Sequence, residues 1–289
     1  MPPLAWAYLI GCNVLAGSSF AAMTFVLRGF TPASAVFWRL FLGAVILLAG
    51  LRRKDGEAPV SGADRLRILA AGLFGLALPM TLGTMGLARS TATNAALLMG
   101  FEPAALFVVG AILYGERLTA LKVAAIAAGL LGSSLIVLQG PPWNASLRGH
   151  WEGDLLLSLA AVSWAVYALI GKSVMKRVRP AVFTTATTAV AILPMALLAG
   201  SSIVPAAVPP REALLGLAFQ AVGITYGATL MWNKGLELVP ASTMAQFIFL
   251  QPLVGVVLGL LLKGDPLTVP SAWGGLLIIL GMILAARKA

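Results

Sequence analysis

Long apolar runs, separated by short polar turns or turns containing glycine and proline, occupy almost the whole chain. A helix that crosses a bilayer needs about 20 mostly apolar residues at a rise of 1.5 Å per residue, and ten runs meet this requirement. The predicted spans are residues 4–27, 32–51, 66–88, 91–114, 118–138, 152–171, 180–200, 211–234, 239–262 and 267–286. The pattern therefore predicts an all-α integral membrane protein with ten transmembrane helices.

The composition indicates that lipid, rather than water, surrounds most of the chain. Hydrophobic residues make up 60% of the 289 residues and charged residues 10%, whereas a soluble domain carries about 25% charged residues. The single Cys12 and the single His150 exclude a disulfide framework and a metal cluster built from these residue types. The first run has no basic segment before it and is long enough to remain as a span, so we expect no cleavable signal peptide.

The net charge of +10 comes from basic residues in the gaps between apolar runs, a distribution typical of membrane proteins rather than of nucleic-acid-binding proteins. Of the 20 Lys and Arg residues, 14 fall on one side of the predicted spans and five on the other, while Arg39 lies inside the second span. Basic residues collect on the cytoplasmic side of membrane proteins. We therefore predict an even number of spans with both termini in the cytoplasm, and no nucleic-acid partner.

Two stretches of the chain repeat the same pattern 149 residues apart. "ATNAALLMGFEPAALFVVGAILYGERLT" (92–119) can be laid on "ASTMAQFIFLQPLVGVVLGLLLKGDPLT" (241–268) without a gap. We therefore predict two copies of a five-span unit, residues 1–138 and 152–289, joined by a periplasmic linker at 139–151. Because five is odd, the second copy would cross the membrane upside down relative to the first. Such an inverted repeat is found in many secondary transporters.

Each copy carries a polar residue followed by a proline near the middle of an apolar run, Glu102-Pro103 and Gln251-Pro252. A proline removes one backbone hydrogen bond and kinks a helix, and the freed carbonyl group can face a cavity but not lipid. We predict that both prolines are hinges and that Glu102 and Gln251 face a central cavity between the halves, roughly 16–18 Å deep. The alternative is a structural kink at which a protonated Glu102 bonds to a neighbouring helix.

These features resemble the EamA unit of the drug/metabolite transporter superfamily. The shared features are the polar residue with its proline, the turn "GERLT" (115–119), its echo "GDPLT" (264–268) and "FWRL" (37–40) in the second span. The resemblance covers nearly the whole chain. It implies ten helices around a central cavity, a place in the bacterial inner membrane, and carrier-type transport of small metabolites, with amino-acid exporters among the best-described relatives.

The second turn departs from the family's usual Glu-Arg but keeps an acidic residue. We expect Glu116 and Asp265 in these turns to cap the helices that follow, because a carboxylate suits the positive end of a helix dipole.

Arg39 is an unusual residue for a membrane span, since it lies about 10 Å below the predicted outer surface beside Trp38. Burying an unpaired guanidinium costs about 3 kcal/mol or more, so Arg39 needs a partner. Glu102 is the acidic residue predicted to lie well inside a span. We hypothesise that the two residues pair in the empty carrier and that a substrate carboxylate competes for Arg39. The alternative is that Arg39 extends to the outer headgroups.

Further polar and aromatic side chains are candidates for the wall of the predicted cavity. Besides Arg39 and Trp38, we expect Asn13, Ser18, Trp164, Tyr167, Gln220, Tyr226, Trp232 and Gln246 to include substrate contacts. Aromatic faces can hold an apolar group or a cation, and amides and hydroxyls can orient a zwitterion. The alternative for each is ordinary packing between helices. Four threonines are expected to bond to their own backbone: Thr184, Thr185, Thr187 and Thr188.

A single cation at depth favours a zwitterionic substrate over a phosphorylated sugar, which would need several Lys or Arg residues. We predict a monomeric exporter of small polar or amphipathic metabolites, amino acids above all, that needs no cofactor. A drug or metallophore exporter, with proton exchange at Glu102, and a flippase for a lipid-linked substrate are the alternatives. An intramembrane enzyme is not expected, because His150 lies outside the spans.

Overall fold

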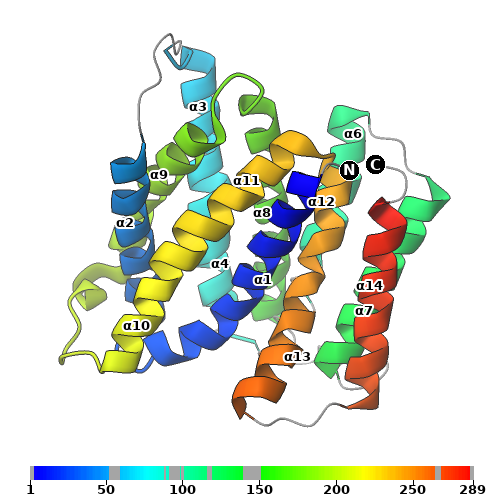
Figure 1. Ribbon diagram of the computed structural model, residues 1–289. Coiled ribbons are helices and arrows are strands. Elements are labelled where there is room, and N and C mark those ends of the chain that lie inside the picture. The colour runs from blue at the N-terminus through cyan, green and yellow to red at the C-terminus, as the bar shows by residue number, and fades with distance from the viewer. Residues whose placement is uncertain are drawn as a thin grey trace.

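The computed structural model describes residues 3–51, 59–87, 89–90, 98, 101–115, 119–138, 151–263 and 268–286. The regular structure of these residues is helical throughout, and no strand occurs among them. Figure 1 shows the helices packed into a bundle whose members run roughly along one direction. The all-α prediction is therefore confirmed.

The first half of the chain contributes two long helices, a composite span and two further helices. They are α1 (Pro3–Val26), α2 (Pro32–Gly50), the consecutive segments α3 (Gly62–Ala70), η1 (Ala71–Ala77) and α4 (Leu78–Leu87), then α6 (Phe101–Tyr114) and α7 (Ala120–Leu138). The segment η1 is a π-helix within an otherwise α-helical span.

The second half follows the same order. Its elements are α8 (Trp151–Val174), α9 (Pro180–Ala199), the short 3₁₀ turn η3 (Gly200–Ile203), the consecutive segments α10 (Arg211–Phe219), η4 (Gln220–Ala228) and α11 (Thr229–Leu238), then α12 (Ala241–Ile248), α13 (Leu250–Lys263) and α14 (Val269–Ala286). The segment η4 is again a π-helix.

Local sequence explains where several of these helices begin. Thr31 caps α2 through its side chain and Pro32 occupies the first turn, where its missing N–H is not needed. Thr119 accepts from the backbone of Lys122 at the start of α7, and Thr268 accepts from the backbone of Ser271 at the start of α14. The predicted caps Glu116 and Asp265 lie outside the described residues.

The described helices suit a membrane. Seven are long and apolar enough to cross one, and three shorter apolar helices cover Phe101–Ile112, Thr243–Leu258 and Val269–Leu284. Large apolar side chains remain exposed around the bundle, among them Ile112, Leu197 and Leu261 at 75% exposure each. Lipid can cover such a surface, whereas water would leave it unfavourably hydrated. The chain is therefore a multi-pass membrane protein.

The predicted spans agree with these helices to within a few residues, apart from two regions. The span predicted at 239–262 is interrupted at Phe249, between α12 and α13. In the span predicted at 91–114, the structure describes Leu98 and α6, and the rest lies outside the described residues, as does nearly all of the predicted linker at 139–151.

Helix starts recur at a spacing of 148 or 149 residues along the chain. The starts of α3, η1, α6 and α7 are repeated 149 residues later by α10, η4, α13 and α14, and those of α1 and α2 are repeated 148 residues later by α8 and α9. The packing repeats as well. Helix α1 of the first half has its partners in the second half, because it packs on α13 and η4; the equivalent helix α8 packs on α6 and η1 of the first half. In the same way, α2 packs on η4 and its equivalent α9 packs on η1.

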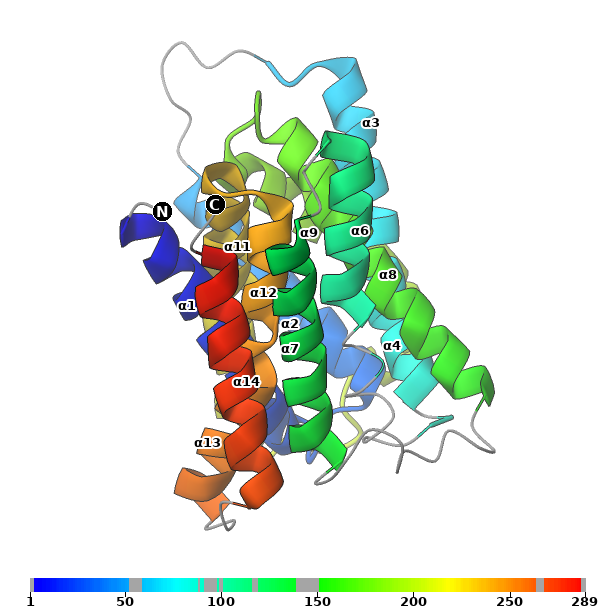
Figure 2. The ribbon, with the colours of Figure 1, turned by 90° about the vertical axis from the view of Figure 1, so that its right-hand side faces the viewer.

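Two helix pairs join corresponding elements of the two halves, α2 with α9 and α7 with α14. Figures 1 and 2 both show α7 beside α14. These two helices approach closely at Gly132 and Gly274, where a Cβ added to either glycine would lie 2.5 Å from the carbonyl oxygen of the other. The start of α1 and the end of α14 lie at the same end of the bundle in both views.

Candidate functional site

A cavity of about 440 Å³ lies inside the bundle and is lined from both halves of the chain. Its walls come from α1, α2, η1, α4 and α6 of the first half and from α8, α9, η4, α11 and α13 of the second. The lining reaches Met23 and Thr84, close to the last residues of α1 and α4. The cavity therefore extends toward the end of the bundle opposite the start of α1.

Many lining residues form pairs at the spacing that relates the two halves. Pairs 149 residues apart are Leu76 and Thr225, Pro79 and Ala228, Met80 and Thr229, Gly83 and Trp232, and Glu102 and Gln251; pairs 148 residues apart are Ala16 and Trp164, Ser19 and Tyr167, and Leu40 and Thr188. Equivalent positions of the two halves thus face one shared space. The side chains at these positions differ, so the two walls present different chemistry.

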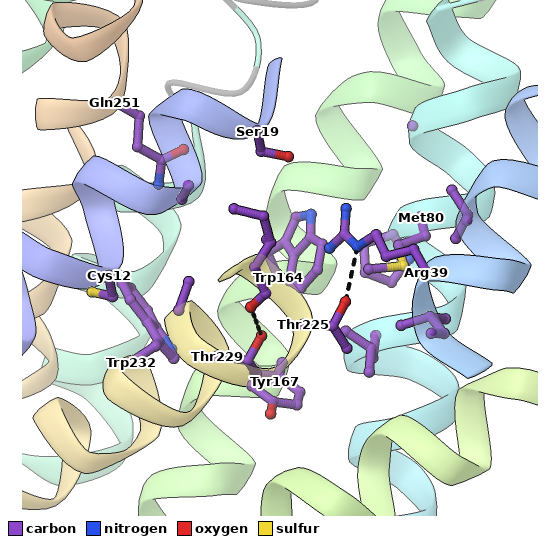
Figure 3. Close-up of a pocket in the computed structure, with 18 of the residues that line it drawn as sticks. Cys12, Ser19, Arg39, Met80, Trp164, Tyr167, Thr225, Thr229, Trp232 and Gln251 are labelled. Carbon is purple, nitrogen blue, oxygen red and sulfur yellow. Dashed lines mark hydrogen bonds between the residues drawn. The ribbon is translucent and has the colours of Figure 1, made fainter. Parts of the chain in front are cut away.

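Arg39 extends from α2 into this cavity, where its Nε donates a hydrogen bond to Thr225 Oγ1 at 3.2 Å (Figure 3). It is therefore directed inward rather than toward outer headgroups. Glu102 lines the same cavity, but within the described part of the chain the two side chains form no ion pair with each other. The hypothesised pairing is absent from this structure. Both charged groups can instead meet a molecule that enters the cavity.

The residues Glu102-Pro103 and Gln251-Pro252 occupy the same place in their helices, the second and third residues of α6 and α13. The proline ring clashes with the carbonyl group four residues earlier, and for Pro252 that residue is Ile248, the last of α12. Pro252 thus explains locally why the span breaks at Phe249. The residue equivalent to Ile248 before Pro103 lies outside the described residues.

Gln251 and Asn13 connect α13 to α1 at the cavity wall. Gln251 Nε2 donates to Asn13 Oδ1 at 3.0 Å, and Asn13 Nδ2 donates to the carbonyl oxygen of Leu9 at 2.8 Å. Both side chains line the cavity. The amide groups therefore hold each other in place and contribute neutral polar surface.

Trp164 and Tyr167 provide an aromatic wall on α8. Their rings meet edge to face with 6.5 Å between centroids, and both line the cavity. The buried Tyr167 hydroxyl accepts a hydrogen bond from Asn233 Nδ2 at 2.9 Å, and Asn233 also donates to Thr184 Oγ1 at 2.7 Å. The Tyr167 hydroxyl is thus part of a buried network, while Trp164 and Arg39 are directed into the same space (Figure 3).

Five predicted contacts lie outside the lining of this cavity, and Trp38, Gln246 and Tyr226 are three of them. Trp38 packs against Phe37 and Phe41, and its Nε1 donates to the carbonyl oxygen of Ile203 at 2.8 Å. The Gln246 amide faces the backbone of α7, in an orientation that donates to Ala125 O at 3.1 Å and accepts from Ile126 N at 3.3 Å. Tyr226 is half-buried on η4, next to Thr225, which faces the cavity instead. Packing accounts for Trp38 and Gln246.

Of the remaining candidates, one lines the cavity and two form hydrogen bonds outside its lining. Trp232 lines the cavity, whereas the Ser18 hydroxyl bonds to the carbonyl oxygen of Val14 in its own helix. Gln220 bonds to Ser19 of α1. The predicted backbone bonds of Thr184, Thr185 and Thr187 are confirmed.

Sequence reasoning did not single out Thr225, Thr229 or Ser19 as lining residues, and it expected Thr188 to bond to its backbone. The buried Thr188 Oγ1 lines the cavity and has no hydrogen-bond partner among the described residues. Thr229 lies 149 residues after Met80, and both residues line the cavity. No sequence signal marks the π-helix that aims Thr225 at Arg39.

An ion pair between Asp64 and Arg177 joins the two halves at the end of the bundle where α1 begins. Asp64 on α3 is buried and accepts from Arg177 Nη2 at 2.7 Å and Nε at 3.0 Å, and from Arg67 Nη1 at 3.1 Å. The hydrogen bond to Asp64 holds the pKa of Arg177 above its ordinary value. Because Arg177 follows α8, this contact connects the first half to the second at the end opposite the cavity mouth.

A bundle of membrane-crossing helices around a largely apolar cavity, which holds a few charged and polar groups and is lined by both halves of the chain, is the arrangement expected of a membrane transport protein. In the described residues, no group of three or more His, Cys, Asp or Glu side chains could hold a metal ion. The sequence pattern of the EamA-like transporter family matches residues 4–138 and again residues 151–287. The chain belongs to the EamA-like transporter family.

Relatives named as transporters are consistent with this assignment, and a solved structure shares the fold. The chain is 25% identical over 281 residues to "Uncharacterized transporter YyaM" of Bacillus subtilis (strain 168), covering 96% of this chain and 92% of that protein. It is 25% identical over 293 residues to "Probable terminal-alkyne amino-acid exporter" of Streptantibioticus cattleyicolor, covering 98% and 93%. A crystal structure matches with a TM-score of 0.82 over 99% of this chain and 97% of that chain, at 18% identity, which shows a shared fold.

Proposed function

We propose that the protein is a secondary transporter that exports small polar or amphipathic metabolites, amino acids above all, from the cytoplasm. The observation that carries the proposal is the cavity itself, in which Arg39 and Glu102 face a shared space without pairing within the described residues. A zwitterion brings the two opposite charges that these groups would bind. The aromatic face of Trp164 and the apolar wall suit a side chain of moderate size.

The proposed architecture is ten transmembrane helices in two inverted repeats of five. Support comes from the recurrence of helix starts, the exchange of packing partners between halves, and the paired lining residues. The first and last described helices place both termini at the same end of the bundle (Figure 2), which is expected for an even number of crossings. Two separate matches to the family pattern fit two repeats.

The proposed transport cycle is alternating access in the bacterial inner membrane, with both termini in the cytoplasm. The basic residues around Asp64, including Arg67 and Arg177, favour that end as the cytoplasmic one. The cavity extends toward the other end, so the arrangement fits an outward-facing state closed on the cytoplasmic side. Breaking the Asp64–Arg177 contact would accompany opening to the cytoplasm.

Counterflow in liposomes tests the proposal. Liposomes that contain the purified protein are loaded with unlabelled amino acids, and a panel of labelled amino acids is added outside. We expect saturable exchange of at least one zwitterion. We expect Arg39→Ala and Glu102→Gln each to reduce this exchange at least tenfold while the protein keeps its elution volume. A hydrogen bond or ion pair to a charged group contributes about 1.5–3 kcal/mol, which corresponds to at least tenfold.

Matched controls are Arg28→Ala, in an exposed turn, and Glu152→Gln, in the exposed first turn of α8. If both cavity variants exchange amino acids at the wild-type rate, Arg39 and Glu102 do not belong to the substrate-binding site. The absence of exchange for every amino acid in the panel would overturn the proposed substrate class. Lipid scrambling in the same liposomes would favour a flippase instead.

A drug or metallophore exporter driven by protons is a second candidate, favoured by the Glu102 carboxyl group that faces the cavity. Proton exchange at Glu102 would make efflux depend on an imposed pH gradient, and Glu102→Gln would abolish that dependence. Equal flux with and without the gradient would exclude this coupling.

A further inference from the structure

We propose that Thr225 is a positioning residue that holds the Arg39 guanidinium so that its two Nη groups present a fork to the anionic group of the substrate. The inference rests on the proposed function, in which Arg39 binds the substrate carboxylate. It concerns a residue of η4 that acts on the substrate through Arg39.

The hydrogen-bond pattern fixes the direction in which Thr225 acts. Thr225 Oγ1 donates its only proton to the carbonyl oxygen of Gln220 at 3.1 Å, five residues earlier, a spacing that matches the π-helical register of η4. Its oxygen is therefore left as an acceptor, and Arg39 Nε donates to it at 3.2 Å. Thr225 Oγ1 therefore accepts a hydrogen bond from Arg39 Nε, and its own proton is not available to bind a substrate anion in place of Arg39.

Gln220 is itself held in place. Its Nε2 donates to the carbonyl oxygen of Ser19 at 2.8 Å, and the Ser19 hydroxyl donates to Gln220 Oε1 at 2.9 Å. The Gln220 side chain is fully buried. The start of η4 is thus tied to α1, and the carbonyl group that receives the Thr225 proton has a defined position.

Gly43 brings α2 close enough for this contact. It lies one turn after Arg39, and a Cβ added to it would lie 2.4 Å from Thr225 Cγ2. The methyl group of Thr225 therefore packs on the backbone of α2 while its hydroxyl group receives Arg39. A serine at this position would keep the acceptor, and a valine would keep the shape but remove it.

The consequence concerns the remaining donors of the guanidinium. An arginine has five N–H groups in a rigid plane, and committing Nε to Thr225 leaves the four on Nη1 and Nη2. Thr225 is the one side chain with which Arg39 hydrogen-bonds in the described part of the chain. The Nη groups can then donate hydrogen bonds to both oxygens of a carboxylate that approaches end-on.

The first test uses phenylglyoxal, which modifies accessible guanidinium groups, followed by peptide mass spectrometry of Arg39. We expect Thr225→Val to slow Arg39 modification at least threefold, because Nε beside a methyl group leaves its present position. We expect Thr225→Ser to restore the wild-type rate within twofold. The exposed Arg28 is the internal reference, and Thr185→Val, which removes a buried hydroxyl group away from the cavity, is the matched control.

The second test measures exchange of L-leucine in liposomes. We expect Thr225→Val to raise KM about tenfold with kcat within twofold, and to have no further effect in an Arg39→Ala background. If wild-type protein does not exchange L-leucine, the full amino-acid panel decides the proposed function and the phenylglyoxal test decides the role of Thr225. An unchanged or faster modification rate in Thr225→Val, with the fold intact, would overturn the positioning role.

Discussion

Polar side chains in the cavity wall of this transporter are held mainly by neutral partners. Arg39 is held by a threonine, and Gln251 is held by Asn13. A neutral partner orients a side chain without cancelling the charge, so Arg39 remains available to a ligand. The site is therefore organised before a substrate enters.

The bond between Gln251 and Asn13 gives a residue-scale prediction about stability. Asn13 is 1% exposed, so Gln251→Leu leaves Asn13 Oδ1 buried without its partner, at a cost of about 1–3 kcal/mol. We expect a lower thermal midpoint in detergent. The double variant Asn13→Leu/Gln251→Leu removes both polar groups and should recover most of the loss. A double variant less stable than Gln251→Leu would contradict the pairing.

The sequence could indicate how deep each candidate residue lies, but less about which way its side chain faces. Depth follows from counting 1.5 Å per residue from the start of a span. Facing direction is harder to derive, because the spans are apolar on most sides. Arg39 and Trp164 line the cavity, while Trp38, adjacent to Arg39, turns to Ile203. Around η4, the π-helical register shifts facing directions further, which is why Thr225 rather than Tyr226 lines the cavity.

At the scale of elements, length and apolar content predicted most helix bounds. The proline at position 252 indicated a kink inside the span 239–262, whereas the structure has a break at Phe249, beside the Ile248 carbonyl group with which the ring would clash. The π-helices η1 and η4 were not predicted. A π-helix changes the register of backbone hydrogen bonding without requiring a particular residue type, so the residues of η1 and η4 do not mark it. The two segments pack against α8 and α9 and against α1 and α2, respectively.

The contact between α7 and α14 gives an element-scale prediction. Gly132→Ala would place a Cβ 2.5 Å from the Gly274 carbonyl oxygen, which lies on a backbone that cannot move aside easily. Overpacking of this kind costs about 1–3 kcal/mol, so we expect a lower thermal midpoint. Gly255→Ala on α13 is the control, since nothing lies within 4 Å of its added Cβ. Equal midpoints for the two variants would show that α7 and α14 are not tightly packed.

At the scale of the whole molecule, two halves with matching helix order enclose one cavity and meet again at Asp64 and Arg177. The cavity and this ion pair lie toward opposite ends of the bundle. A protein that alternates between two shapes needs a contact that exists in one shape and breaks in the other. The Asp64–Arg177 pair is suited to that role because each half supplies one partner.

Asp64→Asn should weaken this contact and shift the population toward the inward-open shape. Asparagine cannot form the ion pairs with Arg177 and Arg67 that the carboxylate forms. The exchanged pair Asp64→Arg/Arg177→Asp should restore the wild-type distribution. Glu212→Gln, in the exposed first turn of α10, removes an acid near the other end of the bundle and is the control.

Access to a single cysteine in the cavity from each side of the membrane tests the central claim most directly. The reporter is Ala16→Cys, at a lining position, in a Cys12→Ala background. We expect an impermeant thiol reagent to label it from the periplasmic side, and Asp64→Asn to increase labelling from the cytoplasmic side at least threefold. Labelling from one side alone, unchanged by Asp64→Asn, or no labelling from either side would contradict two halves that alternately expose one shared cavity.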